Sequence, residues 1–410
     1  MVSPEWYCVQ QLINAQHKKI SITSKDHKSY SQIYAWYKGV LRRYFFYEWC
    51  CTRLAKKSIK EPLKYFLMLG MYRLDTHPDQ VAQIVNHMVS MTQPSKAKPL
   101  VNAVLREYLR SKERLISKSL GDPVLVYDIR PSLLERLQQA QINWRQWIKQ
   151  VKQVPKICIL VNVQRVRLEE LCTLWEQQEV LFEKGDCPNM LVLKRSCLVH
   201  QLPGYQEGFF SVVSGANQLL ADQWTLNPES YVLDACAAPG GKSALIYNKG
   251  VKQIQATDID LERIERLTQN MQRLGIKAEI TVRDWTESVA EKQFDAIWLD
   301  VPCSATGVIA KHPEIAVWDR NDHLNEAVQS QLLRNAWRSL KPGGTIFYTT
   351  CSVLPHENEQ MINCFLEEVN MSEALPMPSQ GIFSTSVGAY YQSDYSLDVV
   401  YGCLLKKTDK

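Results

Sequence analysis

From about residue 211 onward, strand-like and helix-like segments alternate along the chain. Five apolar, β-branched stretches predict strands, at residues 231–236, 253–258, 278–284, 295–300 and 344–350. Amphipathic patterns such as that of residues 261–275 predict helices between them. A strand–helix–strand order requires parallel strands joined by right-handed crossovers, with helices on both faces of the sheet. We therefore expect an α/β, doubly wound, Rossmann-like domain over residues 211–410, with strand and helix alternating to the end.

The 410 residues are too many for one ordinary core, so two or three domains are expected. Residues 1–140 show helical periodicity without strand-like alternation, and predict an all-α bundle. One helix face is expected from the spacing of Ile33, Trp36, Tyr37, Val40, Leu41 and Tyr44. Residues 141–210 read as a small α+β segment, with strands in "KICILVNV" and "MLVLKR" and a helix in "LEELCTLWEQQ".

Charge is distributed unevenly along the chain. Residues 1–150 hold 24 Lys and Arg against 11 Asp and Glu, whereas the remainder holds 24 against 32. A basic segment of this size is typical of proteins that bind a polyanion, most simply a nucleic acid. Solvated helix faces would give the same count, and charge alone does not separate the two interpretations.

The 12 cysteines include no C-x-x-C pair, and none of the 8 histidines lies near a Cys pair at zinc-ligand spacing. We therefore expect reduced thiols, a cytoplasmic location and no metal centre. No apolar run approaches the length of a membrane span, and the first residues carry no cleavage signal, so no membrane association is expected.

Ligands of doubly wound sheets bind outside the carboxyl ends of the strands. There the first predicted strand runs into "CAAPGGKS" (236–243), and the next three end near Asp258, Asp284 and Asp300. The glycines allow a ligand to approach the backbone, and an acid after the second strand suits ribose hydroxyls. A purely structural turn would explain the glycines alone. Together with the acids they indicate an adenosine-containing cofactor, although neither G-x-G-x-x-G nor G-x-x-x-x-G-K-[ST] is present.

Two cysteines follow the fourth and fifth predicted strands, Cys303 in "LDVPCSATG" and Cys351 in "YTTCS". These strands are neighbours in the usual doubly wound order, so both thiols are expected over one crevice beside the cofactor. A single cysteine at a strand end usually only packs. Two on adjacent strand ends favour a chemical role.

Three segments, "DACAAPGGKS", "DVPCSATGVIAKHPEI" and "TTCSVLPHENE", closely resemble motifs of RNA (cytosine-5)-methyltransferases that use S-adenosylmethionine. In the basic segment, "LMLGMYRLDTHPDQVAQIVNHMV" and "PLVNAVLREYLR" resemble the NusB-type RNA-binding domain. The combination is similar to the RsmB (Sun/Fmu) type of the RsmB/NOP family. It implies methylation of a cytosine in small-subunit (16S) ribosomal RNA by a NusB-like domain (1–140), an α+β segment (141–210) and a catalytic domain (211–410), acting as a monomer.

The resemblance also implies roles for individual residues. Cys351 would be the nucleophile, Cys303 would assist release, and Asp300 would contact the base and the methionine end of the cofactor. The residues implied as ligands of S-adenosylmethionine are Cys236, Ala237, Ala238, Pro239, Gly240, Gly241, Lys242, Asp258, Asp284 and Asp300.

Three segments depart from the family pattern. Val161 stands where an arginine is usual, "VSGANQ" (213–218) lacks the aspartate of the usual "QDASAQ", and "DVVYGCLL" (398–405) replaces a "DGFFYAKL"-like strand. These changes concern how RNA around the target is held, and they spare the cofactor turn and both cysteines. His312 and His356, inside the matching motifs, are expected to be structural.

Other functions remain open at this stage. The target base could lie in another RNA. An RNA-binding scaffold that lost catalysis would keep the fold, but it has no need of two thiols. A methyltransferase acting on an amino nitrogen typically carries an N/D-P-P-Y/F motif after the fourth strand, and "DVPC" has a cysteine in place of that aromatic residue.

Overall fold

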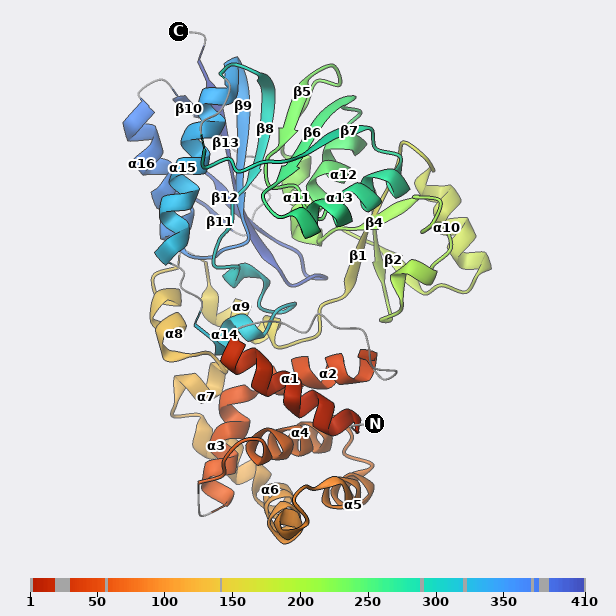
Figure 1. Ribbon diagram of the computed structural model, residues 1–410, viewed down its shortest axis with the longest axis vertical. Coiled ribbons are helices and arrows are strands. Elements are labelled where there is room, and N and C mark those ends of the chain that lie inside the picture. Colours follow the sequence, from red (N-terminus) through yellow and green to blue (C-terminus); the bar gives the residue numbers. More distant parts are fainter. Residues whose placement is uncertain are drawn as a thin grey trace. The chain divides into compact units, whose positions relative to one another are not determined.

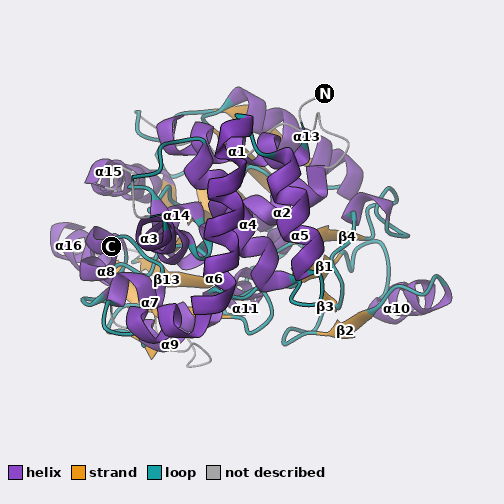
Figure 2. Cartoon of the chain, turned by 90° about the horizontal axis from the view of Figure 1, so that it is seen from below, coloured by secondary structure: helices purple, strands orange, loops and turns teal. Residues whose placement is uncertain are grey.

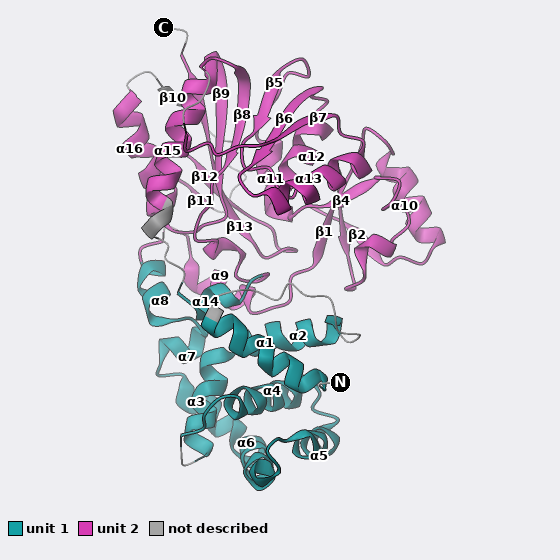
Figure 3. Ribbon diagram, in the orientation of Figure 1, with its two compact units in different colours: residues 1–138, 312–320 teal, residues 139–311, 321–410 magenta. Residues whose placement is uncertain are grey.

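The computed structural model describes residues 3–18, 30–55, 58–140, 142–287, 291–319, 323–369, 372–375 and 383–408 (Figure 1). The chain forms two compact units, coloured separately in Figure 3. Unit 1 comprises residues 1–138 and 312–320, and unit 2 comprises residues 139–311 and 321–410.

Helices are the only regular elements among the described residues of unit 1, which confirms the predicted all-α bundle (Figure 2). Its elements are α1 (Pro4–Lys18), α2 (Tyr30–Leu41), α3 (Tyr44–Leu54), α4 (Leu63–Thr76), α5 (Val81–Met91), η1 (Ser95–Ala97), α6 (Lys98–Ser119), α7 (Pro123–Tyr127), α8 (Pro131–Leu137) and α14 (Glu314–Val317). Helix α4 is central, with Phe66 and Met71 fully buried against the other helices.

The single helix predicted across residues 33–44 is wrong in one respect. All six apolar positions are buried as predicted, but α2 ends at Leu41 and a new helix begins at Tyr44. Arg43, the N-cap residue of α3, has a non-helical backbone with φ −131°. Burial of both flanking helices therefore outweighs the continuous helical pattern of the sequence.

A segment from the motif "KHPEI" belongs to unit 1. Glu314 of α14 is 1% exposed in its side chain, and its Oε2 lies 3.0 Å from the buried Nζ of Lys38 on α2. The backbone N–H of Arg130 donates to the carbonyl of Ala316 (2.9 Å). His312 Nδ1 lies 3.2 Å from Glu314 Oε1.

The first part of unit 2 contains a four-stranded antiparallel sheet in the order β2-β3-β1-β4. Its elements are α9 (Trp144–Val151), β1 (Ile157–Val161), α10 (Leu168–Gln177), β2 (Phe182–Lys184), β3 (Met190–Leu193), η2 (Val199–Gln201) and β4 (Phe210–Val212). The segment has a core of its own around Trp175. It lies in the same compact unit as the larger sheet, so the division at residue 210 remains a prediction.

The larger sheet has the order β11-β12-β13-β9-β8-β5-β6-β7. The elements up to β9 are α11 (Gly215–Asp222), β5 (Tyr231–Asp234), α12 (Gly241–Asn248), β6 (Gln253–Asp258), α13 (Leu261–Leu274), β7 (Ala278–Val282), β8 (Phe294–Asp300), η3 (Thr306–Val308), α15 (His323–Ser339) and β9 (Leu340–Thr350). The five predicted strands are parallel, with β8 beside β9 as expected. Helices α11, α12 and α13 share one apolar core on one face, and α15 and α16 (Glu359–Val369) cover the other (Figure 1). The predicted doubly wound α/β class is therefore confirmed.

The expected alternation to the end of the chain is wrong beyond β9. The remaining elements are η4 (Pro355–Glu357), α16 (Glu359–Val369), β10 (Ser372–Leu375), β11 (Phe383–Ser384), β12 (Ala389–Gln392) and β13 (Val399–Lys407). Strand β13 pairs with β9 in the antiparallel direction, and β12 pairs with β13. The short connection between β12 and β13 leaves no room for a crossover helix, which a parallel pair would need. None of the described helices is both long and apolar enough to cross a membrane.

Candidate active site

Two cysteines at the ends of neighbouring strands of unit 2 are in contact. Strands β8 and β9 pair in parallel with Asp300 opposite Thr349. Cys303 lies three residues beyond β8 and Cys351 directly follows β9, and their Sγ atoms are 3.3 Å apart. The structure thus brings together the two thiols that the sequence pattern places over one crevice.

The buried carboxylate of Glu357 fixes the segment that carries Cys303. Its Oε1 accepts from the backbone N–H of Ser304 (2.8 Å), and its Oε2 accepts from the Ser304 hydroxyl (2.6 Å). Gln329 donates to Glu357 Oε1 (3.3 Å) and to the carbonyl of Pro302 (2.8 Å). Ser304 is therefore held by Glu357, in the segment that follows Cys351, and Pro302 is held by Gln329 of α15. Sequence reasoning missed Glu357, because an acid in a loop motif gives no sign that it will be buried.

The Cys303 thiol holds its proton strongly. Its hydrogen bond with Cys351 raises its pKa well above the usual value, and burial and the charges of Cys351 and Glu357 act in the same direction. Two thiolates in contact would repel each other, so one sulfur at a time can carry the charge. The pair therefore suits one nucleophilic thiolate beside one protonated thiol.

A cavity of about 270 Å³, the thiol cavity, lies at the carboxyl ends of the parallel strands. Asp258, Asp284, Asp300 and Cys236 line it, together with both thiols. The structure thus gathers the predicted strand-end acids around one space. Arg263, Trp285, Val328 and Leu332 also line it and were not predicted.

Two of these unpredicted residues organise the cavity wall. Arg263 Nη2 donates to the carbonyl of Ala238 (2.9 Å) and lies 3.3 Å from Asp258 Oδ2. Trp285 donates from Nε1 to Thr257 Oγ1 (2.7 Å). Trp285 directly follows the predicted acid Asp284, which was a usable signal. Arg263 had none, since it reads as part of a solvated helix face.

Lys242 and Asp300 form an ion pair at the edge of the thiol cavity. Lys242 Nζ lies 2.6 Å from Asp300 Oδ2, and Thr349 donates to Asp300 Oδ1 (2.9 Å). Burial alone would lower the pKa of Lys242, but the Asp300 carboxylate raises it above the usual value. Lys242 and Thr349 thus fix the position of the Asp300 carboxylate, which has a positively charged lysine beside it.

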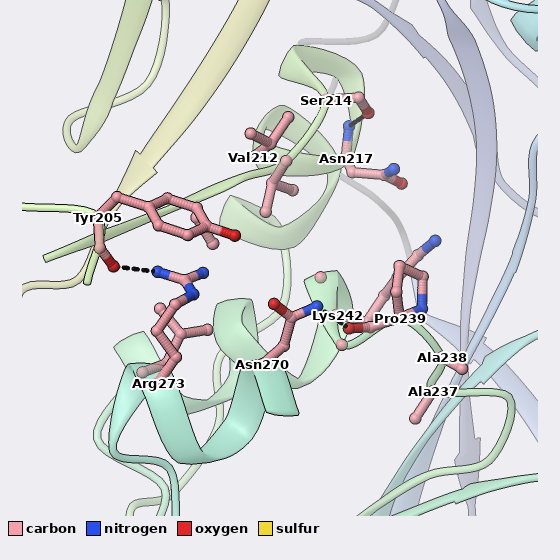
Figure 4. A pocket seen from close by; sticks show the side chains of 15 residues that line it. Tyr205, Val212, Ser214, Asn217, Ala237, Ala238, Pro239, Lys242, Asn270 and Arg273 are labelled. Carbon is pink, nitrogen blue, oxygen red and sulfur yellow. Dashed lines mark hydrogen bonds between the residues drawn. The ribbon is translucent and has the colours of Figure 1, made fainter. Parts of the chain in front are cut away.

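The rest of the predicted cofactor turn lines a neighbouring space. Residues 237–242 border a cavity of about 350 Å³, the turn cavity, shown in Figure 4. Gly240 has φ +107°, and a Cβ there would lie 2.4 Å from Met271 Cε of α13. The backbone angle therefore favours glycine at this position, whereas the Met271 methyl group is the end of a flexible side chain that can move aside. The turn is divided, because Cys236 borders the thiol cavity and the other six residues border the turn cavity.

Asp234, at the end of β5, lies fully buried near this turn. Its Oδ2 accepts a short hydrogen bond from the Ser243 hydroxyl (2.6 Å). Burial raises its pKa to about 7, although the Ser243 bond and the charge of Lys242 oppose the shift. Sequence reasoning missed this residue, since Asp234 lies inside the predicted strand 231–236.

Two of the departures from the family pattern and both histidines can be placed in the fold. Val161 is buried in the core of the small sheet, and its carbonyl accepts from Asn248 Nδ2 (2.6 Å). His312 contacts Glu314 in unit 1, and His356 Nε2 lies 3.6 Å from Glu326 Oε1. Neither histidine is among the described residues that line the two cavities. Ser214 lines the turn cavity.

Known proteins resemble this chain in sequence and in fold. The profile of the family "16S rRNA methyltransferase RsmB/F" matches residues 223–401. Ribosomal RNA small subunit methyltransferase B of Serratia proteamaculans is 35% identical over 349 residues, which are 80% of each chain. Among solved structures, PH0851 matches with a TM-score of 0.77 at 20% identity over 99% of both chains. NSun6 from Pyrococcus horikoshii, solved with SFG, matches with a TM-score of 0.57 at 16% identity over 64% of this chain and 93% of that one.

Because their sequence identities are low, the two structural matches show a shared fold and nothing more. The sequence match to the curated relative is far stronger and extends beyond the catalytic region into the helical unit's share of the chain. The chain therefore belongs to the RsmB/F family of 16S rRNA methyltransferases.

Proposed function

We propose that this protein transfers a methyl group from S-adenosylmethionine to carbon 5 of a cytosine in 16S rRNA, through a covalent bond between Cys351 and the base. The observation that carries the proposal is the 3.3 Å contact between Cys303 and Cys351, in a cavity that also gathers three strand-end acids. Transfer to an amino nitrogen requires no thiol, whereas carbon 5 requires a nucleophile to activate the ring.

The Cys351 thiolate adds to carbon 6 of the base, and the electrons of the C5–C6 double bond become available at carbon 5. Bound S-adenosylmethionine supplies the electrophilic methyl group that this carbon takes up. A solvent water then takes the proton from carbon 5, the electron pair of that C–H bond restores the double bond, and the bond between carbon 6 and sulfur breaks, so that Cys351 leaves as a thiolate. Cys351 thereby returns to its starting state.

Cys303 assists the release step. Its thiol keeps its proton at the ordinary pH of the reaction, because its pKa is raised. At 3.3 Å from Cys351 Sγ it is placed to donate a hydrogen bond to the departing thiolate, which stabilises that charge while Cys303 keeps its proton. Asp300, fixed by Lys242 and Thr349, is proposed to hold the polar edge of the base beside the thiols.

The residues of the thiol cavity fit the cofactor. Asp258 provides carboxylate oxygens for the ribose hydroxyls, and its position is fixed by the N–H groups of Ala238 and Asp260. Trp285, Val328 and Leu332 provide apolar surface suited to an adenine ring. Cys236 and Asp284 complete the proposed site, with the backbone of residues 237–242 at the methionine end.

The basic helical unit is proposed to hold the ribosomal RNA. The excess of 13 positive charges in residues 1–150 supports contact with phosphates. A thiol cannot reach carbon 6 inside a stacked helix, so the target cytosine must be single-stranded or flipped out.

The test uses the full-length protein with 16S rRNA from cells that lack its gene and S-adenosylmethionine labelled in its methyl group. We expect label in 5-methylcytidine after nuclease digestion, and bisulfite sequencing should map it to one cytosine. 23S rRNA and transfer RNA serve as matched substrates. Label in a cytosine methylated on its amino group would refute the covalent route, label in another RNA would reassign the substrate, and no label would favour a scaffold.

A further inference from the structure

The turn cavity is lined by polar groups that form no hydrogen bond within the described part of the protein. Figure 4 shows the side chains of Tyr205, Asn217, Asn270 and Lys242 around one open space. Within the described residues, the Tyr205 hydroxyl, the Asn217 amide and Asn270 Oδ1 have no hydrogen-bond partner, while Asn270 Nδ2 donates to the Pro239 carbonyl (2.9 Å). These side chains are half-buried, so their polar atoms are open to the cavity and available to a polar ligand in place of water.

The charge around this cavity is positive. Arg273 donates from Nη1 to the carbonyls of Tyr205 (2.8 Å) and Phe210 (3.0 Å), and its guanidinium lies 4.0 Å from the centre of the Tyr205 ring. It has no ion pair with a carboxylate among the described residues, and no described Asp or Glu lines the cavity. Ser214 and Asn217 lie in the segment 213–218, where this chain lacks the aspartate of the family pattern. An anion therefore meets attraction without a repelling carboxylate on the wall.

The remaining wall is apolar, formed in part by Val212, Pro239 and Leu274. An apolar face, amide groups and a nearby guanidinium match the three parts of a nucleotide: the flat base, its polar edge and its phosphate. Asparagine amides are suited to pair with a base edge. The volume of about 350 Å³ is in the range of small-ligand sites.

The Lys242 side chain connects the turn cavity with the thiol cavity, where the reaction is proposed to occur. Lys242 lines the turn cavity, and its Nζ pairs with Asp300, which lines the thiol cavity. Neither thiol lines the turn cavity. We infer that the turn cavity holds an unstacked RNA nucleotide directly next to the target cytosine, with the Tyr205 hydroxyl and the Asn217 amide reading its base. This inference rests on the proposed methylation of RNA.

Two substitutions test the inference without breaking an internal side-chain bond. Tyr205→Phe removes only the unused hydroxyl, and Asn217→Ala removes only the unused amide. Tyr247→Phe and Asn189→Ala are the matched controls, since neither residue is among the described residues that line the turn cavity or the thiol cavity. All proteins are full-length, and each is assayed with an RNA fragment containing the mapped cytosine. Two further RNAs carry an abasic nucleotide on the 5′ or the 3′ side of that cytosine.

We expect the Tyr205→Phe/Asn217→Ala double variant to lose roughly 10- to 100-fold in kcat/KM for the natural RNA, as for two lost hydrogen bonds. Its affinity for S-adenosylmethionine, measured by calorimetry, should equal that of the wild type. One abasic RNA should be a poor substrate for the wild type and for the control variants, and the double variant should no longer distinguish it from the natural RNA.

Other outcomes overturn the inference in distinguishable ways. Weaker binding of S-adenosylmethionine to the double variant would assign the turn cavity to the cofactor. Unchanged RNA kinetics, with wild-type methylation intact, would refute the inference and leave the proposed function standing. A wild-type protein that methylates no cytosine in the natural RNA would remove both.

Discussion

Cys303 Sγ and Cys351 Sγ lie 3.3 Å apart, although 48 residues separate them in the chain. The parallel pairing of β8 and β9 creates this contact, and the bonds of Glu357 to Ser304 maintain it. The raised pKa of Cys303 keeps the proton on that sulfur, whereas Cys351 is the proposed nucleophile in the same cavity. This difference allows their roles to be separated by substitution.

Cys351→Ala should abolish methylation and any covalent bond to RNA, because it removes the nucleophile. Cys303→Ala should still allow attack and methyl transfer, but slow release of the sulfur. A denaturant-resistant protein–RNA adduct should therefore accumulate with Cys303→Ala alone, in the presence of S-adenosylmethionine. The measurement is a denaturing gel with labelled 16S rRNA.

The double variant Cys303→Ala/Cys351→Ala should form no adduct, and Cys364→Ala, at an exposed cysteine, is the matched control. An adduct with Cys351→Ala but not with Cys303→Ala would exchange the two roles. Intact methylation in both single variants would mean that the thiols only pack.

A second prediction concerns cofactor binding. Asp258→Asn should weaken the affinity for S-adenosylmethionine by roughly 1.5–3 kcal/mol, as expected for hydrogen bonds to a charged group. Asparagine keeps the size of the side chain, which limits damage to the Ala238 and Arg263 contacts. Calorimetry measures the affinity, with the exposed Glu262→Gln as the control. Equal affinities in wild type and Asp258→Asn would refute the ribose contact.

Much of the catalytic fold could be predicted because each element leaves a local pattern. Strand β6 matches residues 253–258, and α13 ends at Leu274 with Gly275 at φ +71°, as an amphipathic run closed by glycine indicates. The break before Tyr44 and the antiparallel return of β13 depend on packing between distant segments, which local periodicity does not encode.

Local sequence patterns likewise predicted only part of the candidate active site. Strand-end position was enough to place Asp258, Asp284, Asp300 and the two cysteines around one cavity. The pairs that organise them join residues 58 and 53 positions apart, Lys242 with Asp300 and Ser304 with Glu357. Such pairs depend on the sheet order and on side-chain direction, so the polar network became visible only in the folded chain.

A third prediction concerns the acid stability of unit 1. Burial alone would raise the pKa of Glu314, but the hydrogen bond with His312 and the charges of Lys38 and His312 outweigh it and lower the pKa to about 2, from 4.5. A depressed carboxyl pKa stabilises the fold above pH 4.5, and this contribution is lost as the pH falls from 4.5 to 2. The shift corresponds to roughly 3 kcal/mol.

Glu314→Gln should therefore unfold more easily than the wild type at pH 7, and the difference should shrink as the pH falls from 4.5 to 2. Urea unfolding of the full chain, followed by hydrogen exchange of the α2 amides, measures it. Glu135→Gln, an exposed acid of unit 1, should show no such pH dependence. A difference that stays constant with pH would mean that Glu314 is not an ionised partner of Lys38.

The last prediction concerns the basic face of unit 1. Arg106, Arg110, Arg114 and Lys118 are all exposed and follow one another at intervals of four residues along α6. Such spacing places them on one side of the helix. Deleting residues 1–140 would leave Glu314 without Lys38, so substitution is the cleaner test. Glutamine keeps helix propensity while removing the charge.

Arg106→Gln/Arg114→Gln/Lys118→Gln should weaken RNA binding and reduce the slope of log K against log salt by about 2–3, since each phosphate contact contributes about 0.7–0.9. Affinity for S-adenosylmethionine should stay unchanged. The control carries Arg266→Gln, Lys277→Gln and Lys292→Gln, which remove three exposed charges from unit 2. Filter binding of 16S rRNA at several salt concentrations gives the slope. An equal loss in both triple variants would indicate a general effect of net charge, and an unchanged slope in the α6 variant would mean that this face is only solvated.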